Sequence, residues 1–248
     1  MKKQVLATIL FVLCAMFTQT SAIAQGFIIY KNNGESLRLL YAELDSIVTF
    51  DVSIDRVNGH ECIDLGLSVK WASCNVGATK PEEYGGYYAF GETEEKAKYD
   101  WWTYKWCRSG NEKNLSKYTP GDHDGDNKKI LDPSDDVATV KWGSSWRMPT
   151  EKEIDELLNK CAWKWTTYNG VNGYLVTGTN GNSIFLPAAG FRWITNLYDD
   201  GSVGYYWSAT VKSNIHNDAE YLKFDSDKCN SPYVWRRSAG HTIRPVTE

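Results

Sequence analysis

The chain has 248 residues, of which 42% are hydrophobic and 23% are charged, and its formal net charge is -4. This balance excludes a disordered chain, a collagen and a coiled coil. The negative charge and the lack of a basic tract argue against a nucleic-acid-binding protein.

The first 24 residues have the pattern of a secretion signal. A basic start precedes the apolar run Val5–Phe17, and a small-x-small sequence ends at Ala24. As a helix this run spans about 20 Å, which is too short for a hydrocarbon core of about 30 Å. We therefore predict a signal peptide at 1–24, cleaved between Ala24 and Gln25. The mature chain would then be periplasmic, at the cell surface or secreted, with no transmembrane segment.

Residues 25–55 are predicted to form a small β-hairpin unit. Phe27–Tyr30 and Leu37–Leu40 flank Asn32-Asn33-Gly34, and Asn-Gly is a strong hairpin turn signal. Ser46–Phe50 offers a third short strand. A unit of about 30 residues buries little apolar surface, so we expect it to extend a sheet edge or to serve as a stalk.

From residue 56 to residue 248, short β-rich runs alternate with Gly and Asn turns. This pattern argues against a doubly wound parallel sheet and, with the helices below, predicts an α+β domain with a mixed or antiparallel sheet. The predicted strands are Val69–Ser73, Gly86–Phe90, Tyr174–Thr177, Ser183–Leu186, Tyr205–Ser208, Tyr221–Phe224 and Thr242–Val246.

One clear and one short helix are predicted. Thr150–Glu153 is a capping box, and apolar residues follow it at helical spacing, so a helix over about 151–161 should lie with one face on the sheet. Those residues are Ile154, Leu157, Leu158 and Cys161. A shorter helix is expected from Ser134 to just before Gly143, with Val137 and Val140 pointing inward.

Five cysteines follow the predicted cleavage point: Cys62, Cys74, Cys107, Cys161 and Cys229. Disulfides persist in the oxidising compartments that exported proteins reach. An odd number leaves at least one thiol unpaired or intermolecular, and spacing alone does not select among the two-bridge patterns. The lack of a C-x-x-C pair near a histidine argues against zinc.

Seven segments occur in a characteristic order: Cys62–Ala72, Asn75–Ala78, Tyr84–Glu92, Trp142–Thr150, Ser183–Gly190, Tyr206–Ser208 and Ile243–Val246. They resemble the Fibrobacter succinogenes major paralogous domain, and Glu43–Phe50 resembles the short leader often found before it. The resemblance implies an exported cell-envelope protein of gut or oral Bacteroidetes-type bacteria. Most members of that family lack an assigned biochemical activity.

The same landmarks resemble a C-type-lectin-like fold, in which Arg147–Thr150 would open the helix and Arg244–Val246 would close the domain. The resemblance implies that residues 56–248 form this domain, that strands from its two ends pair, and that long loops carry the binding surface. It also places cysteines at positions 74 and 161, so Cys74 and Cys161 are the expected disulfide.

The sequence lacks the motifs that the known activities of similar domains require. Formylglycine-generating enzymes need two neighbouring cysteines near the C-terminal end, but only Cys229 follows Cys161. The Glu-Pro-Asn, Gln-Pro-Asp and Trp-Asn-Asp sequences of calcium-dependent lectins do not occur. Nor does a nucleophile elbow, an H-E-x-x-H sequence or a P-loop, so we predict no catalytic residue.

Asp122, Asp124 and Asp126 alternate in a loop and offer oxygen ligands for calcium. The spacing is not that of an EF-hand, because Asn127 stands where Gly is required and Pro133 where Glu is required. A solvated acidic loop is the favoured interpretation, with an irregular calcium site as the alternative. We therefore expect no cofactor other than calcium.

The aromatic run Tyr99–Trp106 is the best binding candidate, because flat rings cover sugar faces at low rotamer cost. If the run is a strand, Trp101 and Trp102 face opposite ways and one is exposed. We predict a shallow contact surface formed by Trp102, Tyr104 and Trp106; the alternative is that these rings fill the core.

The function expected from the sequence is therefore that of an exported, non-enzymatic binding module for glycans or for envelope or host proteins. An extracellular hydrolase with an unrecognised carboxylate pair and a structural component of a surface appendage remain as alternatives.

Overall fold

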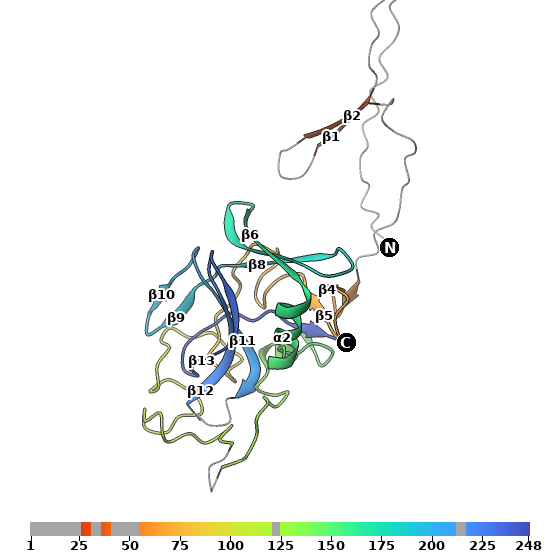
Figure 1. Ribbon diagram of the computed structural model, residues 1–248. Coiled ribbons are helices and arrows are strands. Elements are labelled where there is room, and N and C mark those ends of the chain that lie inside the picture. The colour runs from red at the N-terminus through yellow and green to blue at the C-terminus, as the bar shows by residue number, and fades with distance from the viewer. Residues whose placement is uncertain (1–25, 31–35, 41–54, 121–124, 212–216) are drawn as a thin grey trace, which may run out of the picture. The chain divides into compact units, whose positions relative to one another are not determined.

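The computed structural model describes residues 26–30, 36–40, 55–120, 125–211 and 217–248 (Figure 1). The chain divides into two compact units, Met1–Asp51 and Val52–Glu248. In the first unit, β1 (Gly26–Tyr30) and β2 (Ser36–Leu40) pair as antiparallel strands. The predicted cleavage point at Ala24 and Gln25 and the third run, Ser46–Phe50, lie outside the described residues.

The second unit is an α+β fold built mainly from short antiparallel strands. One sheet has the order β14-β5-β4-β3, with β3 (Arg56–Val57), β4 (His60–Ile63), β5 (Lys70–Ala72) and β14 (Val246–Thr247). The second sheet contains β6 (Ala162–Tyr168), β7 (Val171–Thr177) and β8 (Ser183–Pro187). The third contains β11 (Gly204–Val211), β12 (Asp218–Phe224) and β13 (Cys229–Arg236), and β9 (Phe191–Trp193) pairs with β10 (Asn196–Tyr198).

The two ends of this unit meet in one sheet. Val246 of β14 lies opposite Trp71 of β5, and the C-terminus lies beside β5 in Figure 1. Arg244 strengthens this closure although it is fully buried. Its guanidinium donates to the Ala72 and Phe185 carbonyls, at 3.1 and 2.8 Å, and so ties the first sheet to the second.

The helix α2 (Glu151–Lys160) confirms the sequence prediction. The Glu153 carboxylate accepts hydrogen bonds from the Thr150 backbone N–H and hydroxyl, at 2.8 and 3.0 Å. It also forms an ion pair with Arg147, in which both guanidinium Nη atoms contact it. Ile154 and Leu157 are buried against the third sheet, so the apolar face lies where the periodicity placed it.

We expect Thr150→Ala to lower the free energy of unfolding by about 1 kcal/mol, because the N-terminal cap loses its side chain. Leu157→Ala should cost about 2–5 kcal/mol, because the leucine is fully buried. Urea denaturation of both variants provides the measurement. Equal and negligible effects would contradict the packing of α2.

The shorter helix, α1 (Val137–Trp142), starts later than predicted. Asp136 is its N-cap and accepts hydrogen bonds from the Ala138 and Thr139 N–H groups. Val137 is buried as expected, but Val140 is 49% exposed, which corrects its predicted inward orientation. The inward face instead carries Ala138 and Trp142, which are four residues apart and therefore lie on the same side of the helix.

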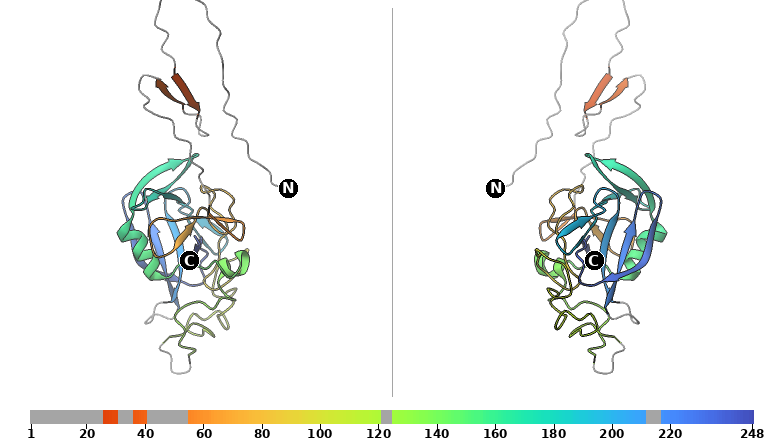
Figure 2. Two further views of the ribbon diagram at one scale, coloured as in Figure 1. Left: turned by 90° about the vertical axis from the view of Figure 1, so that its right-hand side faces the viewer. Right: turned by 90° about the vertical axis from the view of Figure 1, so that its left-hand side faces the viewer.

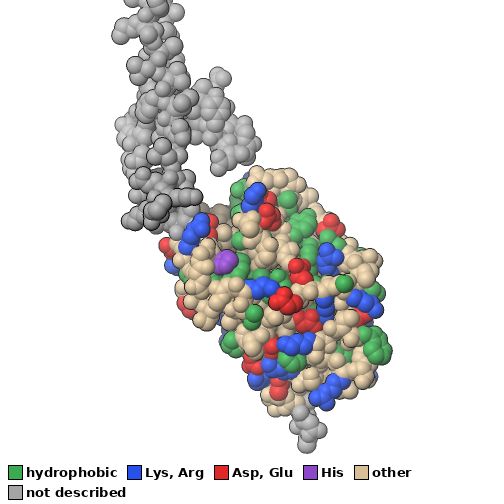
Figure 3. Space-filling view, turned by 180° about the vertical axis from the view of Figure 1, so that it is seen from behind, with side chains coloured by type: hydrophobic (Ala, Val, Ile, Leu, Met, Phe, Trp, Pro, Cys, Tyr) green, Lys and Arg blue, Asp and Glu red, His purple; other side chains and the backbone are tan. Residues whose placement is uncertain are grey.

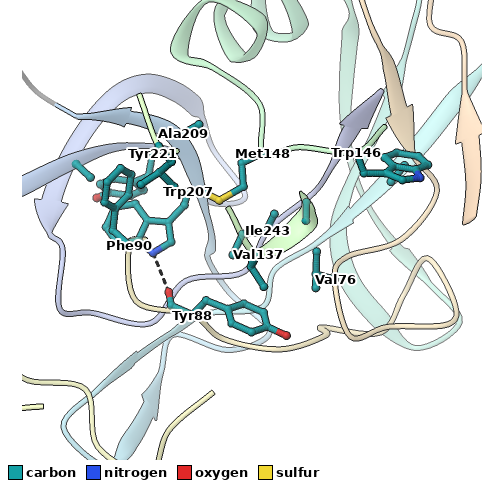
Figure 4. Packing of buried hydrophobic residues seen from close by; sticks show 14 of the residues in the cluster. Val76, Tyr88, Phe90, Val137, Trp146, Met148, Trp207, Ala209, Tyr221 and Ile243 are labelled. Carbon is teal, nitrogen blue, oxygen red and sulfur yellow. Dashed lines mark hydrogen bonds between the residues drawn. The ribbon is translucent and has the colours of Figure 1, made fainter. Parts of the chain in front are cut away.

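Large aromatic side chains dominate the cores. In the first cluster the Trp207 indole donates to the Tyr88 carbonyl at 2.9 Å, with Phe90 and Tyr221 beside it (Figure 4). A second cluster fills the space between α2, the second sheet and the third sheet. Between β5 and α1 the described residues contain no helix or strand. The first part of this stretch packs in the first cluster through Val76, Tyr88 and Phe90, and the yellow-green loops that follow lie at one end of this unit (Figure 2).

Two predicted strands are only partly formed. In Gly86–Phe90 the only ladder contact is the bridge between Tyr88 and His241, and from Thr242–Val246 only Val246 belongs to a strand. Both segments are buried and distribute their backbone hydrogen bonds over several neighbouring segments, so a β-rich sequence does not require a regular ladder here. The predicted runs in β5, β7, β8, β11 and β12 are confirmed.

The expected Cys74–Cys161 disulfide is not formed. All five cysteines among the described residues, Cys62, Cys74, Cys107, Cys161 and Cys229, are free. Cys74 packs in the first cluster, where its thiol lies 3.4 Å from the Ala78 carbonyl oxygen. Cys161 packs against the second cluster, where it caps the C-terminal end of α2. The two cysteines therefore belong to separate cores.

Candidate binding surface

The segment predicted to bind a ligand is a series of turns, not a strand. Trp101 is 7% exposed and Trp102 is 76% exposed, so the two rings differ in exposure as predicted, although strand alternation is not the cause. The turn is held by Asp100, which accepts the Thr103 N–H at 2.9 Å and pairs with Lys98 at 2.7 Å.

Trp102 rests on a glycine. Gly110 has φ of +65°, and a Cβ at this position would overlap the Trp102 indole. One ring face is therefore covered by backbone, while the side chain as a whole remains exposed. A flat ring fixed in this way loses little conformational freedom when a ligand stacks on it.

The other two predicted binding residues are less accessible. Tyr104 is buried, with its hydroxyl donating to the Phe90 carbonyl at 2.7 Å, so its assignment to the contact surface is wrong. Trp106 is half-buried, and its indole donates to the Gly91 carbonyl. The Lys105 and Lys117 ammonium groups lie 4.3 and 4.9 Å from its ring centroid.

We expect Trp102→Ala to change the free energy of unfolding by less than about 0.5 kcal/mol, because the ring is solvent-exposed. Trp101→Ala should cost about 3–5 kcal/mol, because that ring packs on Tyr104. Thermal melts of this adjacent pair test the assignment. Comparable losses in both variants would contradict it.

A larger aromatic surface lies on β9, β10, β11 and β13. We call it the aromatic strip; its members are Phe191, Tyr198, Tyr205, Tyr233 and Trp235. Phe191 is its centre, with ring centroids 5.5 Å from Tyr198, 4.9 Å from Tyr205 and 6.3 Å from Trp235. Tyr198 and Trp235 are 40% and 43% exposed, whereas Tyr205 is buried. The strip therefore leads from the surface into the core.

Strand pairing fixes the order of these rings. Tyr205 lies opposite Lys223, and Tyr221 lies opposite both Trp207 and Tyr233, so all of them share one face of the third sheet. The Tyr221 ring lies 5.8 Å from the Tyr205 ring and 5.8 Å from the Tyr233 ring. A continuous series of rings consequently supports the exposed members.

The loop that carries Trp102 lies beside the strip. Tyr99 and Ile194 exchange two backbone hydrogen bonds, of 2.8 and 2.9 Å, next to the β9–β10 turn. The charge of Glu112 in the same loop contributes to raising the pKa of Asp218 at the start of β12, behind the larger effect of burial. The loop that carries Trp102 is therefore joined by its Tyr99 to the β9–β10 hairpin, which carries Phe191 and Tyr198.

Polar and charged groups border the strip. The Tyr205 hydroxyl donates to Asp199 at 2.7 Å, and the Asn196 amide lies 3.3 Å from the Tyr198 hydroxyl. The Lys223 ammonium lies 5.6 Å from the centroids of both Tyr205 and Tyr233. Rings with hydrogen-bonding groups at their edges are suited to ligands that have apolar faces and polar rims.

Sequence reasoning missed this surface because its strands are short. β9 and β10 have three residues each, too few for the alternation that marks a strand. The available signal is the alternation of Phe191, Trp193, Asn196 and Tyr198, which strand pairing places on one face of the hairpin.

The acidic residues of the predicted calcium loop are only partly described. Asp122 and Asp124 lie outside the described residues. Asp126 accepts the backbone N–H groups of Tyr118 and Thr119, at 2.9 and 3.0 Å, so it fastens the loop. Within the described ranges, no group of three or more His, Cys, Asp or Glu side chains is arranged to hold a metal ion.

Several other acids are engaged in ion pairs. The Lys117 ammonium contacts both Asp132 and Asp135, at 2.6 and 2.5 Å. Burial acts to raise the pKa of Asp135, but hydrogen bonds from Lys117 and Tyr118 outweigh it and lower the pKa overall. Hydrogen bonds from Lys117 and Lys128 lower the pKa of Asp132. These carboxylates stay ionised near neutral pH, and their ion pairs with Lys117 stabilise the fold.

An open hollow of about 430 Å³ lies along α2, lined by residues that include Ser68, Lys152, Asp155 and Glu156. Glu156 is already bonded to Ser68 and Lys160. On the face shown in Figure 3, basic and acidic side chains are interspersed.

Comparison of the chain with protein-family models, with curated proteins and with solved structures found no match. In the part of the chain that the structure describes, no helix is both long and apolar enough to cross a membrane.

Proposed function

We propose that this chain is an exported, non-enzymatic binding protein whose aromatic strip binds glycans. The observation that supports this most strongly is the strip itself: Tyr198 and Trp235 expose large rings around Phe191, and buried rings support them. Stacking on such rings suits the apolar C–H faces of sugars, while Asp199 and Asn196 offer hydrogen-bonding groups at the edge. Trp102, on the neighbouring loop, would extend the contact surface.

Membership in the Fibrobacter succinogenes major paralogous domain family and a C-type-lectin-like fold are part of the same proposal. Three features support it: the ordered segments of the sequence, the pairing of β14 with β5, and the helix that follows Arg147–Thr150. Export, proposed from residues 1–24, would bring the strip into contact with extracellular or envelope glycans. Partners other than glycans are not required by this arrangement.

The test compares binding by the natural chain and by a Tyr198→Ala/Trp235→Ala double variant on a broad glycan microarray. The best-bound oligosaccharide is then used in titration calorimetry. We expect affinity to fall at least about tenfold, which is about 1.4 kcal/mol. Tyr168→Ala is the matched control, because Tyr168 is 43% exposed on β6, outside the strip. Equal binding by the double variant, or no binding to any glycan, would overturn the proposal.

A hydrolase is the second candidate, and one observation favours it. Asp218 begins β12, where it lies opposite Arg236. Burial raises its pKa, with a further contribution from Glu112 and an opposing one from Arg236. A general acid in glycoside hydrolysis needs a raised pKa of this kind. Release of reducing ends that disappears in Asp218→Asn would favour the hydrolase; bound but uncleaved oligosaccharides would favour the binding protein.

A further inference from the structure

A buried histidine packs against the rings that support the aromatic strip. The side chain of His241 is 0% exposed, and its ring stacks on Trp207 with centroids 3.8 Å apart and an angle of 16°. Its backbone exchanges hydrogen bonds with Tyr88, at 2.9 and 3.1 Å. Neither Nδ1 nor Nε2 has a hydrogen-bond partner among the described residues. Backbone hydrogen bonds and ring packing therefore hold His241 in place, whereas its imidazole nitrogens make no hydrogen bond to the described residues.

Three further rings surround the imidazole. The centroids of Tyr221, Tyr205 and Phe191 lie 4.9, 5.4 and 6.2 Å from that of His241. Phe191 and Tyr205 belong to the strip, and Tyr221 joins two of its members. His241 therefore packs directly against Phe191, the ring that contacts both Tyr198 and Trp235.

The groups that face His241 do not stabilise a positive charge. From β11 and β12 the titratable neighbours are Tyr205 and Tyr221, and burial raises the pKa of both phenols, so they stay neutral. Beyond Tyr205 lie the Asp199 carboxylate, bonded to its hydroxyl, and the Lys223 ammonium, over its ring. β9 contributes Phe191, which has no titratable group.

Next to Phe191 on β9, Arg192 places its guanidinium over the Tyr87 ring. Tyr88, from the segment that bridges His241, has a pKa raised by burial and is also neutral. Burial alone lowers the pKa of His241 well below its ordinary value. An imidazolium in this position would be a buried charge without an acceptor, which is costly.

We propose that His241 makes the aromatic strip pH-sensitive: protonation of its ring in mildly acidic surroundings opens the packing beneath Phe191 and weakens glycan binding. The closed form excludes the proton, whereas an opened form binds it at the ordinary histidine pKa of about 6.5. Lowering the pH therefore shifts the equilibrium towards the opened form. Above about pH 7 the histidine is neutral in both forms, so pH no longer affects this equilibrium. The binding half of this inference rests on the proposed function; the structural half does not.

The test follows the near-UV circular dichroism of the full chain from about pH 7.5 to about pH 5. We expect an aromatic signal change in the natural chain that His241→Phe lacks, since phenylalanine keeps a planar ring and cannot titrate. Far-UV spectra at the same pH values show whether secondary structure is retained. His60→Phe is the matched control, because His60 stacks on Trp142 away from the strip and is partly exposed.

Glycan binding is then measured with the array-selected oligosaccharide under the same conditions. We expect affinity to fall at least about tenfold on acidification in the natural chain and less than about threefold in His241→Phe. An unchanged near-UV spectrum, or equal pH responses of the two proteins, would overturn the inference. A spectral transition specific to His241 without glycan binding at any pH would overturn the proposed function instead, and would leave the structural switch in place.

Discussion

Replacing Arg237 by methionine is expected to lower the free energy of unfolding by about 3–5 kcal/mol, because Arg237 is a fully buried cation that satisfies several buried acceptors. Its Nε donates to the Tyr104 hydroxyl at 3.0 Å, and its two Nη atoms donate to the Tyr118 and Lys117 carbonyls at 3.0 and 2.9 Å. Its guanidinium carbon also lies 5.5 Å from the Phe90 ring centroid. Methionine fills the space but leaves these oxygens without a donor.

The neighbouring residue provides the control. Arg236 is exposed and lies over the Trp193 ring, so Arg236→Met should change stability by less than about 0.5 kcal/mol. The free energies of unfolding of both variants are compared by urea denaturation, with one m-value used for the dependence on urea concentration. A cost for Arg237→Met similar to that for Arg236→Met would show that the guanidinium does not organise the loops around Lys117 and Tyr118.

Gly190→Ala is expected to cost about 3 kcal/mol or more and to disturb the strip. Gly190 precedes β9 with φ of +66°, and a Cβ there would overlap the Tyr198 carbonyl oxygen and lie 2.7 Å from the Asp200 nitrogen. A left-handed conformation costs an alanine about 1–2 kcal/mol on its own. The backbone overlap adds to this, because main-chain atoms on the opposite side of the hairpin have to move.

Gly181 separates the two contributions. Its φ is +87°, and a Cβ there would meet nothing within 4 Å, so Gly181→Ala carries only the conformational cost of about 1–2 kcal/mol. We expect thermal melts to show a clearly larger loss for Gly190→Ala. Equal losses would mean that the β9–β10 hairpin moves away at no cost, and that the strip is less rigid than its packing indicates.

The sequence predicted α2 correctly because short-range interactions determine where this helix begins and which face it buries. The capping box at Thr150 and the apolar spacing of Ile154 and Leu157 depend on contacts within one helix and on a single buried face, so sequence was sufficient for α2. The turn signals did not locate β6 and β13, and α1 began at an unexpected residue. In α1, Asp136 provides the cap because its carboxylate also accepts the Met148 N–H at 2.8 Å, a contact distant in sequence.

The candidate site depended on contacts that the sequence does not show. The prediction for Trp102 was right about exposure and wrong about its cause, because turns, not strand alternation, separate it from Trp101. Tyr104 was misplaced because its hydroxyl finds a buried partner, the Phe90 carbonyl. The strip joins rings from β9 to β13, so no window of sequence contains the pattern.

The most direct test of the strip as a glycan-binding surface is the indole N–H region of a ¹⁵N NMR spectrum. The chain has 11 tryptophans, and single Trp→Phe variants assign the signals of Trp235, Trp102 and Trp207. On saturation with the array-selected oligosaccharide we expect the largest shift at Trp235, a smaller one at Trp102, and almost none at the buried Trp207. Saturable binding that leaves the Trp235 signal unmoved would contradict the assignment of the strip.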